Sequence, residues 1–163
     1  MEIKFGYILS AVVLVLDLVL KAVLEGIDLT IIDGVLSFIT VHNTGASFGV
    51  LSGAQWLFIV LAVVFIVGMI LFDILYKKPF GANGWYRAGF TLILAGIIGN
   101  LVDRIAFGYV RDFISLDFIN FPVFNVADIA LTVGCICLVV FMIFFAFREP
   151  KKEEKNNQKI EKN

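Results

Sequence analysis

The chain has 163 residues, of which 60% are hydrophobic, and its formal net charge is −1. A water-soluble domain of this length has too little interior to bury so much apolar surface, so the chain is expected to be integral to a membrane. The near-neutral charge gives no indication of nucleic-acid binding. The two cysteines, Cys135 and Cys137, lie inside an apolar run and are interpreted as packing residues, and no cofactor or metal site is predicted.

Four segments are long and apolar enough to cross a bilayer core, which needs about 20 residues. They run from Phe5 to Leu24, Gln55 to Tyr76, Tyr86 to Phe107 and Val126 to Phe147. Separate apolar runs of this length span a membrane only as helices. The first carries charged residues and is not followed by a cleavage signal, so it is interpreted as a retained span. The predicted fold class is an all-α membrane protein with four transmembrane helices and a small β-containing extracytoplasmic linker.

The basic residues predict the orientation of these spans. The linker between spans two and three carries Lys77, Lys78 and Arg87, and further lysines follow span four, whereas the linker from Glu25 to Ala54 has no Lys or Arg. By the positive-inside rule, both termini are cytoplasmic and the two long polar linkers are outside. Residues 1–148 are expected to form one four-span membrane domain, and residues 149–163 a disordered, charged cytoplasmic tail.

The linker from Leu29 to Leu51 is rich in β-branched and aromatic residues and alternates partly around Val35 to Val41. This pattern predicts one or two short strands followed by a turn at Asn43 to Gly45. Such strands could bind an extended peptide by edge pairing. The linker is also apolar enough to lie on a membrane surface or on a lipid-rich ligand.

Three polar strings lie at the ends of spans three and four, and each carries an aspartate. They are GNLVDR (99–104), VRDFI (110–114) and FNVADIA (124–130), and the predicted topology places Asp103, Asp112 and Asp128 together near the external face. Carboxylates beside hydrocarbon are costly and usually functional. Two aspartates in contact share a proton, and such a pair can activate water and protonate a carbonyl. Because Asn100 and Asn125 each precede an aspartate by three residues, spacing alone nominates Asp103 with Asp128.

Other polar residues allow two interpretations each. Asp17 and Lys21 share a helix face and can pair; they form either a structural ion pair with Lys21 reaching towards the interface, or a brace for the aspartate site. Arg104 is expected either to anchor at lipid headgroups or to hold Asp112. Asn125 orients a carboxylate, binds substrate backbone, or caps the fourth span.

The strings DLVLK (17–21), HNTGASFG (42–49), GNLVDR, VRDFI and FNVADIA together resemble the lipoprotein signal peptidases, the type II signal peptidases of bacteria. The similarity extends from Asp17 to about Val133. Two departures are Leu18, where the family usually has Gln, and Ser47, where Ala is common.

The resemblance implies an aspartic endopeptidase of the bacterial cytoplasmic membrane, with its site near the outer face. It would cleave diacylglyceryl-modified prolipoproteins just before the lipidated cysteine. Its partners would be these substrates and membrane lipid, it would bind no nucleic acid, and it is expected to be a monomer. The resemblance also implies that Asp112 and Asp128 are catalytic and that Asp103 is not. The residues implied to bind substrate or support the pair are Asp17, Lys21, Asn43, Gly45, Asn100, Asp103, Arg104, Asn125 and Ala127.

Two other classes of protein could use buried carboxylates. A small transporter or proton-coupled channel would carry polar residues along its whole depth, whereas the inner halves of spans two and four are almost entirely apolar. A non-catalytic assembly protein would not need several aspartates at one depth.

Overall fold

The computed structural model describes residues 2–45, 50–80 and 83–146. Ser47 and the predicted tail, residues 149–163, lie outside this range. In chain order the elements are α1 (Glu2–Val23), β1 (Leu29–Ile32), β2 (Leu36–Asn43), α2 (Gln55–Phe80), α3 (Gly84–Phe107), β3 (Val110–Leu116) and α4 (Val126–Ala146). All four helices contain a segment long and apolar enough to cross a membrane, which confirms the predicted spans. α2 extends four residues beyond the predicted end at Tyr76.

Local capping explains where α3 begins and ends. The side-chain oxygen of Asn83 accepts hydrogen bonds from the backbone N–H groups of Trp85 and Tyr86, at 2.9 and 3.2 Å, which satisfies donors at the helix N-terminus. At the other end, Gly108 adopts a left-handed conformation with φ 78°, and its N–H donates to the carbonyl of Arg104. These two caps fix the helix that carries Asn100, Asp103 and Arg104.

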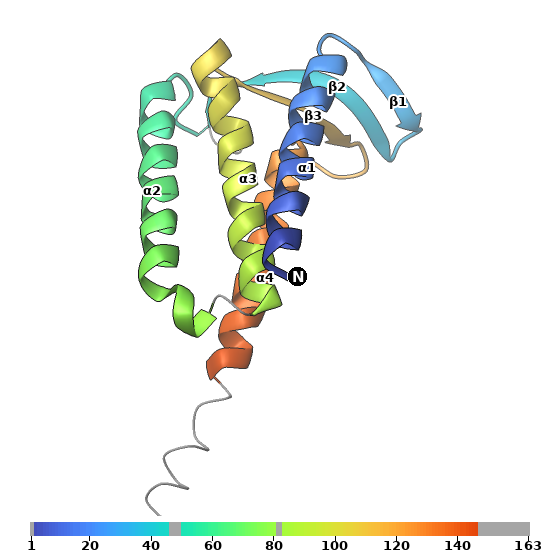
Figure 1. Ribbon diagram of the computed structural model, residues 1–163. Coiled ribbons are helices and arrows are strands. Elements are labelled where there is room, and N and C mark those ends of the chain that lie inside the picture. The colour runs from blue at the N-terminus through green and yellow to red at the C-terminus, as the bar shows by residue number, and fades with distance from the viewer. Residues whose placement is uncertain (1, 46–49, 81–82, 147–163) are drawn as a thin grey trace, which may run out of the picture.

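α3 is the central helix, and α1, α2 and α4 all pack against it (Figure 1). Its approach to α4 is close because both helices carry glycine at the contact. A Cβ at Gly96 would lie 2.5 Å from the carbonyl oxygen of Ala127, and one at Gly134 would lie 2.9 Å from that of Gly89. Small residues that let backbones approach closely are typical of membrane helix pairs. This contact fixes the start of α4 against α3.

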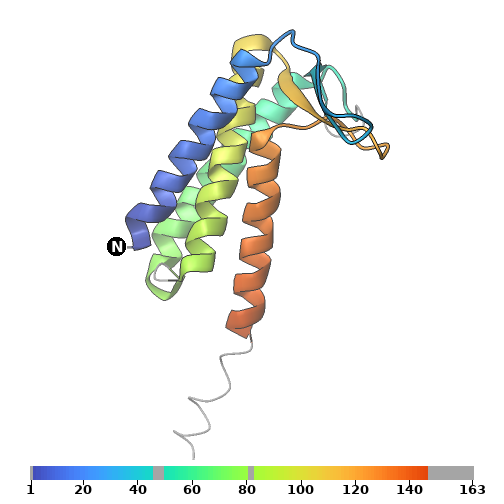
Figure 2. The ribbon, with the colours of Figure 1, turned by 90° about the vertical axis from the view of Figure 1, so that its right-hand side faces the viewer.

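The three strands form one antiparallel sheet in the order β1-β2-β3. It lies beyond the ends of α1 and α3 and the start of α4, and we call this the sheet end of the bundle (Figures 1 and 2). One or two short strands are predicted between Leu29 and Leu51, and two, β1 and β2, are found there. The sequence pattern predicts no strand in the linker from Gly108 to Asn125, yet Val110–Leu116 pairs with β2, with Val41 opposite Asp112.

One outer edge of the sheet is partly occupied by the chain itself. The backbone N–H of Ile114 donates to the carbonyl of Phe124 at 2.8 Å, and the N–H of Phe124 donates back to Ile114 at 3.1 Å. The segment before α4 therefore closes the edge of β3 just beyond Asp112. This pairing draws the N-terminus of α4 towards the sheet.

Candidate active site

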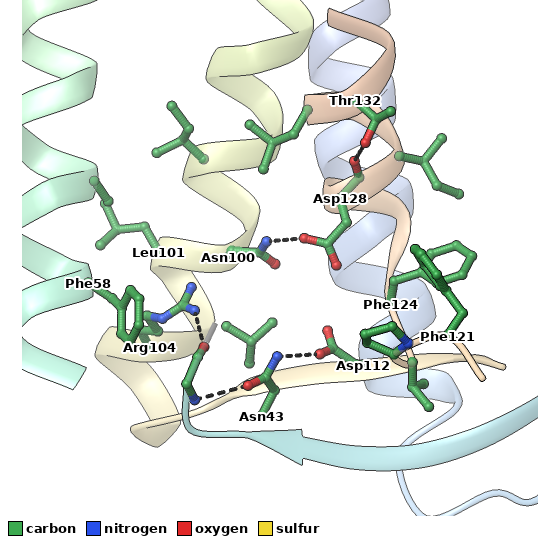
Figure 3. Close-up of a pocket in the computed structure, with 18 of the residues that line it drawn as sticks. Asn43, Phe58, Asn100, Leu101, Arg104, Asp112, Phe121, Phe124, Asp128 and Thr132 are labelled. Carbon is green, nitrogen blue, oxygen red and sulfur yellow. Dashed lines mark hydrogen bonds between the residues drawn. The ribbon is translucent and has the colours of Figure 1, made fainter. Parts of the chain in front are cut away.

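The sheet end contains a cavity of about 760 Å³ between α2, α3, α4 and the sheet. Its polar lining comes from four separate elements, and the remaining lining is mostly aliphatic and aromatic. The polar and charged residues that line it are Asn43, Asn100, Arg104, Asp112, Asp128 and Thr132. The side chains of Asp112 and Asp128 project from opposite sides towards the same space (Figure 3).

Asp128 is held at the N-terminus of α4 by reciprocal capping. The backbone N–H of Asp128 donates to Oδ1 of Asn125 at 3.0 Å, and the backbone N–H of Asn125 donates to Oδ2 of Asp128 at 3.1 Å. This is the geometry of a capping box. Asn125 therefore caps α4, as the sequence allowed, and the same hydrogen bonds fix the direction of the Asp128 carboxylate.

Asp112 lies on β3, with 2% of its surface exposed. Its Oδ1 accepts from Nδ2 of Asn125 at 2.6 Å, and its Oδ2 accepts from Nδ2 of Asn43 at 2.9 Å. Burial and, to a lesser degree, the charge of Asp128 raise the pKa of Asp112 to about 7, although both asparagine hydrogen bonds oppose the shift. Asp112 is therefore a carboxyl group that can hold a proton near neutral pH.

Two buried asparagine amides join the aspartates. Nδ2 of Asn100 donates to Oδ1 of Asp128 at 2.8 Å, and Nδ2 of Asn125 donates to Oδ1 of Asn100 at 3.1 Å. Asn125 therefore contacts Asp112, Asn100 and Asp128 at once. Each of the four carboxylate oxygens accepts one N–H from the protein, so the geometry of the pair is determined before any ligand enters.

Lys21 supports this network from α1 and is fully buried. Its Nζ lies 2.8 Å from Oδ2 of Asp17, 3.5 Å from Oδ2 of Asp103 and 3.0 Å from Oδ1 of Asn100. The predicted Asp17–Lys21 pair is thus confirmed, whereas a Lys21 that reaches the interface was wrong. Burying an ammonium group is costly unless such partners surround it. Asp17 also accepts from the backbone N–H of Ala127 at 2.8 Å, which ties α1 to the first turn of α4.

Asp103 has no exposed surface and lies outside the cavity lining. Its Oδ1 accepts from Nη2 of Arg111 at 2.7 Å, and its Oδ2 accepts from the backbone N–H of Arg111 at 2.9 Å. This hydrogen bonding raises the pKa of Arg111. The geometry therefore favours the Asp112–Asp128 pair over the Asp103–Asp128 pair nominated by spacing, because Asp103 instead anchors β3 to α3.

Arg111 is a site residue that sequence reasoning missed. It is the only basic residue in the linker from Gly108 to Asn125, and the sequence alone assigns it no role. That isolation, one residue before Asp112, is the signal that could have found it.

Arg104 lines the cavity and contacts two other elements of the protein. Its Nη2 donates to the carbonyl of Gly45 at 3.1 Å, and its guanidinium carbon lies 4.8 Å from the ring centre of Phe58 (Figure 3). Gly45 is held in turn by its N–H, which donates to Oδ1 of Asn43 at 2.9 Å. Arg104 therefore connects α2, α3 and the turn after β2.

In the described part of the chain, no group of three or more His, Cys, Asp and Glu side chains is arranged to hold a metal ion. Cys135 is exposed and Cys137 is buried, and both are free thiols on α4, remote from the sheet end.

Four apolar helices and an aspartate-containing cavity at one end of the bundle are the features of a multi-pass membrane protease of the aspartic class. A family model described as "Signal peptidase (SPase) II" matches residues 9–144. The chain belongs to the signal peptidase II family, which confirms the predicted family and the predicted class of enzyme.

Named relatives and solved structures agree. The lipoprotein signal peptidase of Lactobacillus johnsonii is 40% identical over 149 residues, covering 87% of this chain and 94% of its own length. That of Lactiplantibacillus plantarum is 38% identical over 155 residues, covering 90% and 97%. A solved structure described as a bacterial membrane enzyme, at 2.3 Å resolution, superposes with a TM-score of 0.83 at 26% identity, covering 91% of this chain and 93% of that one.

Proposed function

We propose that Asp112 and Asp128 are the catalytic pair with which this signal peptidase II removes signal peptides from diacylglyceryl-modified prolipoproteins, cleaving just before the lipidated cysteine. The observation that carries this assignment is that both carboxylates line one cavity and share Asn125 as a partner. Nucleophilic side chains are not required, because a carboxylate pair that shares one proton supplies both a base and an acid.

In this mechanism the pair holds one proton in the resting enzyme. The ionised carboxylate takes a proton from a water molecule, which attacks the scissile carbonyl carbon. The protonated carboxyl donates its proton to the carbonyl oxygen, giving a neutral tetrahedral intermediate that expels the amine once its nitrogen is protonated. Asn43, Asn100 and Asn125 hold the two carboxylates in place throughout, and Arg104 holds the turn at Gly45 against the cavity.

We also infer the orientation of the chain in the membrane. Four helix ends lie away from the sheet end: the N-terminal end of α1, the C-terminal end of α2, the start of α3 and the C-terminal end of α4 (Figures 1 and 2). Lys77 and Lys78, in the last turn of α2, and the lysines that follow α4 in the sequence favour the cytoplasm for this side. The aspartate pair is then near the outer face, both termini are cytoplasmic, and membrane lipid surrounds the exposed apolar helix faces. Because one chain supplies every partner of the pair, the functional unit is a monomer.

Reconstitution with a diacylglyceryl prolipoprotein tests the assignment. Asp112→Asn and Asp128→Asn preserve side-chain shape but remove the shared proton, so each is expected to lower signal-peptide release by at least about 10²-fold. Asp33→Asn, in the exposed connection between β1 and β2, is the matched control and should retain full activity. Wild-type turnover in either cavity variant would show that the pair is assigned wrongly.

A further inference from the structure

A second hollow, lined by apolar residues, lies farther from the sheet end than the active-site cavity. It measures about 310 Å³ and is lined by α2, α3 and α4, including Phe65, Gly68, Phe72, Phe90 and Leu138. We call it the inner groove. Phe65 lines both the inner groove and the active-site cavity, so the two are adjacent along α2. The groove lining is otherwise almost wholly hydrocarbon.

α2 leaves room for an occupant because of how it packs. It contacts α3, and a Cβ placed at Gly68 would meet no atom within 4 Å. Glycine inside a helix costs about 1 kcal/mol relative to alanine. At Gly68 the missing side chain keeps the groove open rather than permitting a helix contact.

The depth of the inner groove selects between possible occupants. Gly68 lies about 20 Å along α2 from Gln55, at the sheet end, since a helix rises about 1.5 Å per residue. Half of a bilayer core is only about 15 Å thick. Tyr86, another lining residue, lies in the first turn of α3 at the opposite end of the bundle. The groove is therefore beyond the midplane, whereas acyl chains that enter from the outer leaflet end near the midplane.

We propose that the inner groove binds the apolar helix of the substrate's signal peptide. This inference rests on the proposed function, in which the signal peptide runs from the aspartate pair towards the cytoplasm. An apolar helix lying along α2 would contact the cavity at Phe58, pass Phe65 and reach Gly68 and Phe72. The groove then contributes binding energy far from the reacting bond, and so favours substrates whose signal helix is long enough to reach it.

Gly68→Phe tests this directly, because a Cβ at Gly68 meets no atom within 4 Å and the new ring would occupy part of the groove. Two lipidated substrates are compared: one with a complete signal peptide, and one with only four residues before the lipidated cysteine, which reach at most about 14 Å. For the complete substrate we expect KM to rise at least about tenfold with kcat unchanged, as for loss of uniform binding. The short substrate should be unaffected. The control is Ile74→Phe on the same helix, where the side chain is 67% exposed and outside the groove.

Equal loss with both substrates, or no loss with either, would overturn the proposal. Should Gly68→Phe fail to fold, p-benzoylphenylalanine at position 72, in the Asp112→Asn protein with uncleaved substrate, gives a second measurement. An adduct with the signal peptide is expected, and adducts with phospholipid alone would contradict it. Failure of the catalytic assignment is distinguishable, because Asp112→Asn would then cleave both substrates.

Discussion

Asn43 offers a test in which a substitution should extend the pH range of activity rather than narrow it. Nδ2 of Asn43 donates to Oδ2 of Asp112 at 2.9 Å and stabilises its ionised form. With the pKa of Asp112 near 7, the pair keeps its proton below about pH 7 and loses it as the pH rises further. The wild-type kcat/KM should therefore fall on the alkaline side of about pH 7, since this profile reports the free enzyme.

Asn43→Ala removes that donor and should raise the pKa of Asp112. A hydrogen bond to a charged group contributes about 1.5–3 kcal/mol, and 1.36 kcal/mol corresponds to one pH unit, so the alkaline limb should move up by about one to two pH units. The assay is kcat/KM against pH with a reconstituted lipidated substrate. Asn43 also orients Gly45, so the maximal rate is expected to fall even as the limb moves.

The control is Ser37→Ala on the same strand, where the hydroxyl donates to Asp117, outside the cavity. It should leave the limb in place. An alkaline limb in Asn43→Ala that stays in place or moves down would refute the view that Asp112 carries the shared proton.

Two further substitutions test how the bundle supports the pair. Lys21→Met leaves the buried carboxylate of Asp17 without its ion-pair partner and should lower the free energy of unfolding by about 3–5 kcal/mol, measured by denaturation in detergent. Adding Asp17→Asn should restore part of this loss. Equal losses in the single and double variants would contradict the coupling. Gly96→Ala forces a methyl group against the carbonyl of Ala127 and should cost about 1–3 kcal/mol, while Gly84→Ala, in open space, should not destabilise; an unchanged Gly96→Ala protein would show that the α3–α4 contact is loose.

The parts of the fold that could be predicted are those set by local sequence. Apolar run length gives the four helices, and the spacing of Asn125 and Asp128 gives a helix start. β3 could not be predicted in this way, because Val110–Leu116 shows no alternation of buried and exposed residues and is defined by pairing with a strand far away in the sequence.

The site shows the same division. The i, i+4 spacing predicts that Lys21 pairs with Asp17, but its contacts with Asn100 and Asp103 depend on how α1 and α3 pack. Spacing also treats Asn100–Asp103 and Asn125–Asp128 as equivalent frames. They differ because only the second frame begins a helix, whereas Asp103, inside α3, is neutralised by Arg111 from the adjacent strand. Family resemblance, rather than pattern, nominated Asp112.

The hydrogen bonding of the aspartate pair has a consequence for inhibitors. Every carboxylate oxygen of Asp112 and Asp128 accepts one N–H from the protein, although it can accept two hydrogen bonds. A donor on a ligand in the cavity can therefore bind to these oxygens. A compound that places a hydroxyl or protonated amine between the two carboxyl groups should bind more tightly than its ketone or ether analogue of the same shape. Chemists can use that preference to choose a warhead.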